Sequence, residues 1–224
     1  MDNFMLSGNE LDLLLNDLKT VNSYLGGRAL TLNALKKLLT QCNRKTEITI
    51  MDIGCGDGEM LRLCAEYGQQ KGFIFKLIGV DANQNIITIA QEKSSAYKNI
   101  EYYCCEVSSK QFENLEFDIA LCTLFLHHIP ESQIPLLLKK ICSQSKVGVI
   151  INDLHRSWFA FQLFKVFSFF FIRTKIAKHD GLVSVARAFK RKDLEDQQDR
   201  IKGVTSTMQW KWAFRWQWIL QKTN

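Results

Sequence analysis

The 224-residue chain is poor in the residues that mark extended, disordered or cross-linked proteins. It has two prolines and twelve glycines, which excludes a collagen-like or low-complexity chain. Its seven cysteines include no C-x-x-C pair, so their spacing supports neither a zinc site nor a thiol redox motif. We expect buried free thiols and no bound metal. The length and the 46% hydrophobic content fit a single domain, 1–224, with a substantial core.

Long apolar runs and dense charge are also missing. The most apolar stretch, 158–172, contains Gln162 and Lys165 and is shorter than the roughly 20 residues that cross a bilayer. The N-terminus lacks a basic segment followed by an apolar run, so we expect a cytoplasmic protein without a secretory signal. The net charge is +6, and the densest basic stretch, 190–192, is followed at once by acidic residues. This alternation is typical of a solvated helix face and disfavours a nucleic-acid partner.

Apolar strands and amphipathic helices alternate along most of the chain. A helical N-terminal segment, 1–45, precedes the first strand. The predicted strands cover 47–53, 73–80, 100–104, 117–122 and 146–152, with helical patterns between them. Such alternation indicates an α/β fold with a doubly wound, mostly parallel sheet.

The C-terminal region changes to a period of two. Five aromatic residues occupy every second position there, namely Trp210, Trp212, Phe214, Trp216 and Trp218. This pattern indicates two antiparallel strands joined by a tight turn, which would complete a seven-stranded sheet in a three-layer sandwich. We interpret the aromatic stripe as core beneath a helix, and a stacking platform for bases is the alternative.

The segment that points to chemistry is Asp52-Ile53-Gly54-Cys55-Gly56-Asp57-Gly58, between a predicted strand and a predicted helix. Glycines let the backbone turn sharply and let a ligand approach closely. A dinucleotide fingerprint needs G-x-G-x-x-G, whereas this loop has G-x-G-x-G and places Glu59 where a diphosphate would bind. Asp81 follows the second strand, where a carboxylate can accept hydrogen bonds from both ribose hydroxyls. We expect Asp52 to anchor the loop by accepting backbone N–H bonds.

This loop, Asp81 and the stretch 117–130 resemble the seven-stranded, class I S-adenosylmethionine-dependent methyltransferases, over nearly the whole chain. The resemblance implies that the loop meets the methionine part of the cofactor, that Asp81 binds the ribose, and that Ala82 lies near the adenine. Glu106 and Val107 depart from the Asp-Ala pair usual in that family. The implied cofactor-binding residues are Asp52, Gly54, Cys55, Gly56, Gly58, Asp81, Ala82, Glu106, Val107 and Cys122. The implied cofactor is S-adenosyl-L-methionine, with S-adenosyl-L-homocysteine as the product.

Three shorter motifs, 22–27, 153–156 and 179–181, are similar to small-molecule methyltransferases associated with polyketide synthesis. This narrower resemblance implies methyl transfer to an oxygen, or to a carbon, of a small hydrophobic acceptor such as a phenolic, quinone-like or polyketide compound. Such an acceptor benefits from a general base, most often histidine. We predict that His155 or His179 is the catalytic base. His127 and His128 are interpreted as shaping residues.

The segment 155–185 is expected to form an apolar, cap-like insert. Its phenylalanine-rich part fits a lid over a lipophilic substrate, a membrane-surface helix or a homodimer contact, and we favour the lid. A helix that lies on a membrane needs one polar face, and this segment is apolar all round.

Three other functions remain as alternatives. A nicotinamide-dependent oxidoreductase is disfavoured by the glycine register, Glu59 and the terminal hairpin. An RNA or protein methyltransferase is weakened because 122–125 lacks the Asn/Asp-Pro-Pro-aromatic pattern of amino-group methylation. A non-catalytic, cofactor-binding subunit is not dismissed by the sequence, and the acceptor and oligomeric state stay open.

Overall fold

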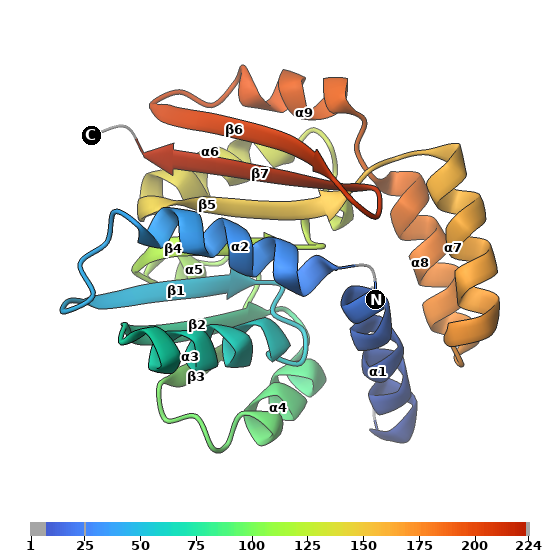
Figure 1. Ribbon diagram of the computed structural model, residues 1–224, viewed down its shortest axis with the longest axis horizontal. Coiled ribbons are helices and arrows are strands. Elements are labelled where there is room, and N and C mark those ends of the chain that lie inside the picture. Colours follow the sequence, from blue (N-terminus) through green and yellow to red (C-terminus); the bar gives the residue numbers. More distant parts are fainter. Residues whose placement is uncertain (1–7, 25, 223–224) are drawn as a thin grey trace.

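A single seven-stranded sheet forms the centre of the computed structural model, which describes residues 8–24 and 26–222 (Figure 1). Leu25 of the 22–27 motif and residues 1–7 of the N-terminal segment lie outside the described residues. The strands are β1 (Glu47–Ile53), β2 (Ile74–Asp81), β3 (Ile100–Cys104), β4 (Phe117–Thr123), β5 (Ser145–Leu154), β6 (Val204–Lys211) and β7 (Arg215–Lys222). Their order is β3-β2-β1-β4-β5-β7-β6.

The mostly parallel sheet with a C-terminal antiparallel hairpin confirms the predicted fold class. The pairs β1–β2, β2–β3, β1–β4 and β4–β5 are parallel. Strand β7 runs antiparallel to β5 on one side and to β6 on the other. The hairpin thus returns the chain into the sheet beside the fifth strand.

Helices cover both faces of the sheet. They are α1 (Gly8–Tyr24), α2 (Gly27–Leu39), α3 (Glu59–Lys71), α4 (Gln84–Lys93), α5 (Lys110–Glu113), η1 (Leu126–His128), α6 (Ile134–Gln144), α7 (Trp158–Phe171), α8 (Lys175–Arg187) and α9 (Arg191–Gln198). Side chains alternate along a strand, so the neighbours Ile50 and Met51 enter different cores. Ile50 packs with α2 and α3, and Met51 packs with α5, α6 and α9. Two cores on one sheet make the predicted three-layer sandwich.

The aromatic stripe of the hairpin is only partly core. Trp216 and Trp218 are buried, as expected, whereas Trp210 is 48% exposed and Trp212 is 76% exposed. The expectation of a buried stripe is therefore wrong for the first two tryptophans. Trp210 lies near the end of β6, the edge strand of the sheet, and Trp212 lies in the turn at 212–214, where Phe214 has a φ of 56°.

Helices α1, α7 and α8 stand together beyond the carboxyl ends of the parallel strands (Figure 1). They share a small apolar core that includes Leu14, Phe164 and Val185. Asp17 of α1 accepts hydrogen bonds from the backbone N–H groups of Arg173 and Thr174, in the turn between α7 and α8. The insert is thus a pair of helices to which the N-terminal helix is attached.

Candidate active site

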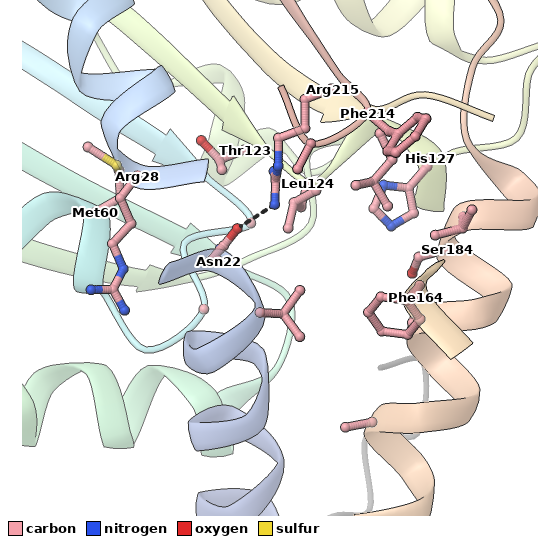
Figure 2. Close-up of a pocket in the computed structure, with 18 of the residues that line it drawn as sticks. Asn22, Arg28, Met60, Thr123, Leu124, His127, Phe164, Ser184, Phe214 and Arg215 are labelled. Atoms are coloured by element: carbon pink, nitrogen blue, oxygen red, sulfur yellow. Dashed lines mark hydrogen bonds between the residues drawn. The ribbon is translucent and has the colours of Figure 1, made fainter. Parts of the chain in front are cut away.

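A cavity of about 430 Å³ lies at the carboxyl edge of the sheet, within the size range of small-molecule sites. The glycine loop lines one side of it, and α1, α7 and α8 line the other (Figure 2). Leu15, Phe164 and Phe167 give the helical side an apolar surface. In a doubly wound sheet, the carboxyl ends of the strands are where ligands bind.

The loop after β1 needs its three glycines. Gly54, Gly56 and Gly58 have φ values of 73°, 54° and 76°, in the left-handed region that favours glycine. A Cβ on Gly54 would lie 2.7 Å from the ring of Phe125, and one on Gly58 would meet the Tyr102 hydroxyl. A Cβ on Gly56 would meet nothing within 4 Å, although Gly56 lines the cavity. Gly56 is therefore where a ligand can approach the backbone most closely.

Two carboxylates at strand ends have different surroundings. The Asp81 side chain accepts hydrogen bonds from the N–H groups of Gly56, at 3.3 Å, and Asn83, at 3.0 Å. Asp52 is 3% exposed and lines the cavity, and its Oδ1 has no hydrogen-bond partner among the described residues. The loop anchor is thus Asp81, in place of the expected Asp52.

The burial of Asp52 favours the protonated form of its carboxyl group. Burial, together with the nearby charge of Asp81, raises the pKa of Asp52 to about 8. A buried acceptor without a donor is costly, and a cationic ligand group in the cavity would remove that cost. Asp52 therefore favours a ligand that carries an ammonium group.

Carboxylates also surround the start of α3. Glu59 forms an ion pair with Arg28 at 2.8 Å, and Asp57 pairs with Lys93 at 2.9 Å. Asp57 also accepts a hydrogen bond from the N–H group of Glu59. Asp57 and Glu59 both line the cavity, where they would repel a diphosphate. The acidic loop fits the amino and sulfonium groups of S-adenosylmethionine better than a dinucleotide.

A buried histidine and aspartate form a hydrogen-bonded pair beside the cavity, in which His127 lines the cavity and Asp153 lies behind it. His127 Nδ1 lies 2.7 Å from Asp153 Oδ1, and the same carboxylate accepts bonds from the N–H groups of His127 and Leu154. Burial alone would raise the pKa of Asp153, but His127 and these donors outweigh it and lower the pKa. The carboxylate of Asp153 contacts Nδ1 of His127, so Nε2 is the ring nitrogen that remains for a ligand in the cavity.

This pair was missed at the sequence level. His127 follows β4, and Asp153 lies near the end of β5, which is paired with β4. Neighbouring parallel strands bring their carboxyl ends to one edge of the sheet, and that placement was the available signal.

The two predicted bases lie in different places. His155 lines the cavity, and its Nδ1 accepts a hydrogen bond from Trp210 Nε1 at 3.0 Å. Burial, with the nearby charge of Lys190, lowers the pKa of His155. In a neutral ring, an occupied Nδ1 puts the proton on Nε2, which then donates. The His179 side chain is exposed on α8 and is not part of the cavity lining. Both assignments stay predictions.

The remaining predicted cofactor residues lie beside or behind the loop. Ala82 follows Asp81 at the end of β2, and its carbonyl accepts a bond from Cys104 Sγ at 3.6 Å. Glu106 is exposed and Val107 is half-buried after β3, the neighbouring strand. Cys55 lines the cavity beside Gly54, whereas Cys122 is fully buried in the core, where burial raises the pKa of its thiol.

Arg215 adds a buried cation to the cavity wall. Its Nη2 donates to Asn22 at 3.1 Å (Figure 2), its Nη1 donates to Asn152 at 3.4 Å, and its Nε has no hydrogen-bond partner among the described residues. Burial lowers its pKa to about 10, against the opposite effect of Asp153, so the guanidinium stays charged at neutral pH. An anionic or partly anionic oxygen of a ligand would suit this position.

Comparisons with known proteins agree with this geometry. The methyltransferase-domain family model matches residues 50–148. A protein of Geobacillus sp. (strain WCH70), named as a methyltransferase, is 27% identical over 127 residues, 55% of this chain and 49% of its own length. The ubiquinone biosynthesis O-methyltransferase of Coxiella burnetii is 25% identical over 115 residues, 50% of this chain and 46% of its own. The chain thus spans about half the length of the curated relatives it matches.

A solved structure extends the likeness to almost the whole fold. The plantazolicin methyltransferase BpumL, in complex with SAH, has a TM-score of 0.70 at 15% identity and covers 93% of this chain and 90% of its own. The narrower resemblance to polyketide-associated enzymes is compatible with these matches. The segment 50–148 thus matches a methyltransferase domain, and the chain shares its fold with a solved methyltransferase that binds SAH.

Proposed function

We propose that this chain transfers a methyl group from S-adenosylmethionine to an oxygen, or less favourably a carbon, of a small hydrophobic acceptor. The observation that carries this proposal is the cavity itself. It joins the open backbone at Gly56 and the unpartnered Asp52 Oδ1 to the His127–Asp153 pair beneath an apolar roof.

The residues present fit the cofactor. Asp52 would accept hydrogen bonds from the methionine ammonium, and Gly54, Cys55, Gly56 and Gly58 would shape the loop against the methionine part. Asp81 would bind the ribose through the carboxylate that also holds the Gly56 N–H. The adenine would lie near the ends of β2 and β3, by Ala82, Glu106 and Val107, with Cys122 as core support behind the loop. The bound cofactor supplies a methyl group on a positively charged sulfur.

We propose His127 as the general base, ahead of His155 and His179. An acceptor hydroxyl would give its proton to Nε2 of His127, and the proton would then pass to solvent. The methyl group that the oxygen gains would be lost from the cofactor sulfur, which would leave S-adenosylhomocysteine. The ionised Asp153 stabilises the imidazolium through the 2.7 Å contact to Nδ1. The buried guanidinium of Arg215 favours the negative charge that develops on the oxygen. His155 is the weaker candidate because the indole of Trp210 occupies its Nδ1.

The roof supports a small hydrophobic acceptor. Phe164 and Phe167 line the cavity from α7, and Ala177 and Val185 line it from α8. Such a surface suits an aromatic or polyketide-like molecule with one ionisable hydroxyl. The names of the relatives, which refer to ubiquinone biosynthesis and to plantazolicin, support a small-molecule acceptor.

We also propose that 1–224 works as one methyltransferase domain, with the insert 155–185 as a lid over the acceptor. The attachment of α1 to the α7–α8 turn through Asp17 supports this arrangement. Closing such a lid would exclude water from the donor and acceptor, which aligned positioning requires.

The test is an acceptor screen. Purified protein is incubated with S-adenosylmethionine and sets of phenols, quinols and enolic pyrones, with total RNA and a protein extract as the rival acceptors. Mass spectrometry follows the gain of one methyl group. We expect O-methylated small molecules and formation of S-adenosylhomocysteine. Methylation of RNA or protein alone would overturn the acceptor class, and cofactor binding without methylation of any acceptor would favour a non-catalytic subunit.

A further inference from the structure

The outer face of α7 is apolar and uncovered. Seven of the fourteen exposed large apolar side chains among the described residues belong to this one helix. Phe159, Leu163, Val166 and Phe170 follow the i, i+4, i+7 spacing of one helical stripe, and Phe169 lies beside it. The opposite face, with Ala160 and Phe164, packs against α1 and α8. Figure 1 shows α7 at the outer edge of the molecule.

This arrangement removes the objection that the sequence raised. A free amphipathic helix needs a polar face to stay at the surface of a bilayer. Here the protein itself covers the inner face of α7, so that only the outer stripe is available to contact a membrane. Helix α7 therefore presents one apolar face to solvent, and the rest of the protein takes the place of the polar face that a free helix would need.

Positive charge is concentrated around the same helix. The insert 155–185 holds five Lys and Arg and one acidic residue, Asp180. The rest of the chain holds 24 basic and 22 acidic residues, so the insert carries four of the six net positive charges of the protein. Lys165 is exposed on α7, and Arg173 and Lys175 are exposed just after its final phenylalanines.

The charge distinguishes between the two occupants that an apolar face could have. A two-fold dimer through α7 would place the same patch on both subunits and set the basic flanks of one copy near those of the other. Like charges at such an interface are unfavourable. An anionic lipid surface complements both the stripe and its flanks, and each basic side chain near it contributes about 1 kcal/mol.

The stripe is also continuous with the cavity. Leu163 of α7 and Trp212 of the hairpin turn line the cavity and are 55% and 76% exposed. Leu163 belongs to both the stripe and the cavity lining, so it connects the outer apolar surface to the proposed acceptor site. A lipophilic molecule in a membrane would meet apolar side chains along this route.

We propose that α7 is a membrane-contact surface, whose outer stripe enters the headgroup–acyl boundary of an anionic bilayer while Lys165, Arg173 and Lys175 bind lipid phosphates. Within the part of the chain that is described, no helix is long and apolar enough to span a membrane. The contact is one of a helix lying in the interface. It depends on the surface of α7 and holds whatever the acceptor is.

The test is co-sedimentation of the full chain with vesicles. One set contains phosphatidylcholine alone, and the other contains about one third phosphatidylglycerol, to give a negative surface. We expect the fraction bound to the anionic vesicles to correspond to at least about tenfold tighter partitioning than to the neutral ones. Failure of the wild type to bind anionic vesicles would overturn the proposal.

Matched variants locate the contact. Phe169→Glu/Phe170→Glu should lower partitioning at least about tenfold, because charged residues replace the inserted aromatics. The control Ile74→Glu/Leu136→Glu changes two exposed apolar residues away from α7 and should bind like the wild type. Equal binding by the α7 variant, or equal loss in the control, would contradict the assignment of this surface.

A second pair separates charge from apolar contact. Arg173→Ala/Lys175→Ala should reduce partitioning to anionic vesicles and flatten its salt dependence, whereas Lys71→Ala/Lys139→Ala, exposed elsewhere, should not. Analytical ultracentrifugation without lipid tests the rival occupant. A wild-type dimer that Phe169→Glu/Phe170→Glu dissociates would assign α7 to a second copy of the chain and overturn the membrane contact.

Discussion

Replacing His127 by glutamine tests the proposed base at the atom that would take the proton. Glutamine can fill much of the same space and can donate to Asp153, but it has no nitrogen that accepts a proton near neutral pH. His128, whose ring lies 4.2 Å from that of His127 and which also lines the cavity, provides the matched control. His128→Gln changes the same residue type without touching the 2.7 Å contact to Asp153.

The expected effect on catalysis is large and that on folding is small. General-base catalysis typically contributes about 10²–10⁴ in rate, which corresponds to about 3–5.5 kcal/mol of activation free energy. Asp153 keeps its bonds from the N–H groups of His127 and Leu154, so the loss of one side-chain bond should cost about 1–3 kcal/mol of unfolding free energy. That loss lies within the stability of an ordinary domain, about 5–15 kcal/mol.

The assay is methyl transfer to a phenolic acceptor identified by the screen, followed as the rate at which S-adenosylhomocysteine forms. His127→Gln should lower kcat at least about 100-fold and leave S-adenosylmethionine affinity nearly unchanged, whereas His128→Gln should keep both near the wild-type values. The reasoning is refuted if His127→Gln keeps the wild-type rate, most sharply if His155→Gln loses it.

Three further predictions follow from the loop and the roof. Because the pKa of Asp52 is about 8 in the fold against 3.8 for the free side chain, folding binds a proton there and this carboxyl makes the fold less stable as pH rises between those values. The unfolding free energy of Asp52→Asn, measured by urea denaturation, should therefore rise relative to that of the wild type by up to about 1.4 kcal/mol per pH unit in that window. The same variant should bind S-adenosylmethionine more weakly in calorimetry. A stability difference that does not change with pH would contradict the raised pKa of Asp52. Gly56→Ala and Gly72→Ala both place a Cβ at positive φ in open space, so each should lose about 1–2 kcal/mol of stability. Only Gly56 lines the cavity, so only Gly56→Ala should lose cofactor affinity, by at least about tenfold. Equal cofactor affinity in the two variants would show that Gly56 is not part of the site. Asp17→Ala leaves the N–H groups of the α7–α8 turn, including that of Thr174, without their acceptor. This change should lower the unfolding free energy by about 3 kcal/mol and speed amide hydrogen exchange in α1. Unchanged exchange would show that the roof does not depend on this contact.

The parallel part of the sheet could be predicted because its central strands are short, apolar and followed by a clear break. Strand β1 ends at a glycine loop and β2 ends at Asp81, so the edge that carries the cofactor loop was visible in the order of residues alone. The register G-x-G-x-G likewise separated this loop from a dinucleotide site before any geometry was known.

The roof was harder to predict because its sequence has no polar side. The helix α7 is apolar on the face that packs and on the face that is exposed, so periodicity could not tell core from surface. The short turn at 212–214 was hidden in the same way, since Trp212 continues an alternation that the backbone in fact breaks.

The base pair was hidden by distance along the chain. His127 and Asp153 lie 26 residues apart and meet only because β4 and β5 are neighbours in the sheet. The local sequence around the histidines favours His155 and His179 as the base. The contact between His127 and Asp153 depends on which strands are neighbours. It becomes visible only when the predicted strand order is used to place each residue at the edge of the sheet.

The central claim, that the acidic glycine loop binds S-adenosylmethionine, is tested most directly by calorimetric titration of the purified chain with S-adenosylmethionine, S-adenosylhomocysteine and NADH, alongside Asp81→Ala. The account predicts micromolar binding of the first two ligands, which is weakened at least about tenfold in Asp81→Ala, and no binding of NADH. Binding of NADH without either of the others would contradict it and would make the chain a nicotinamide-binding protein.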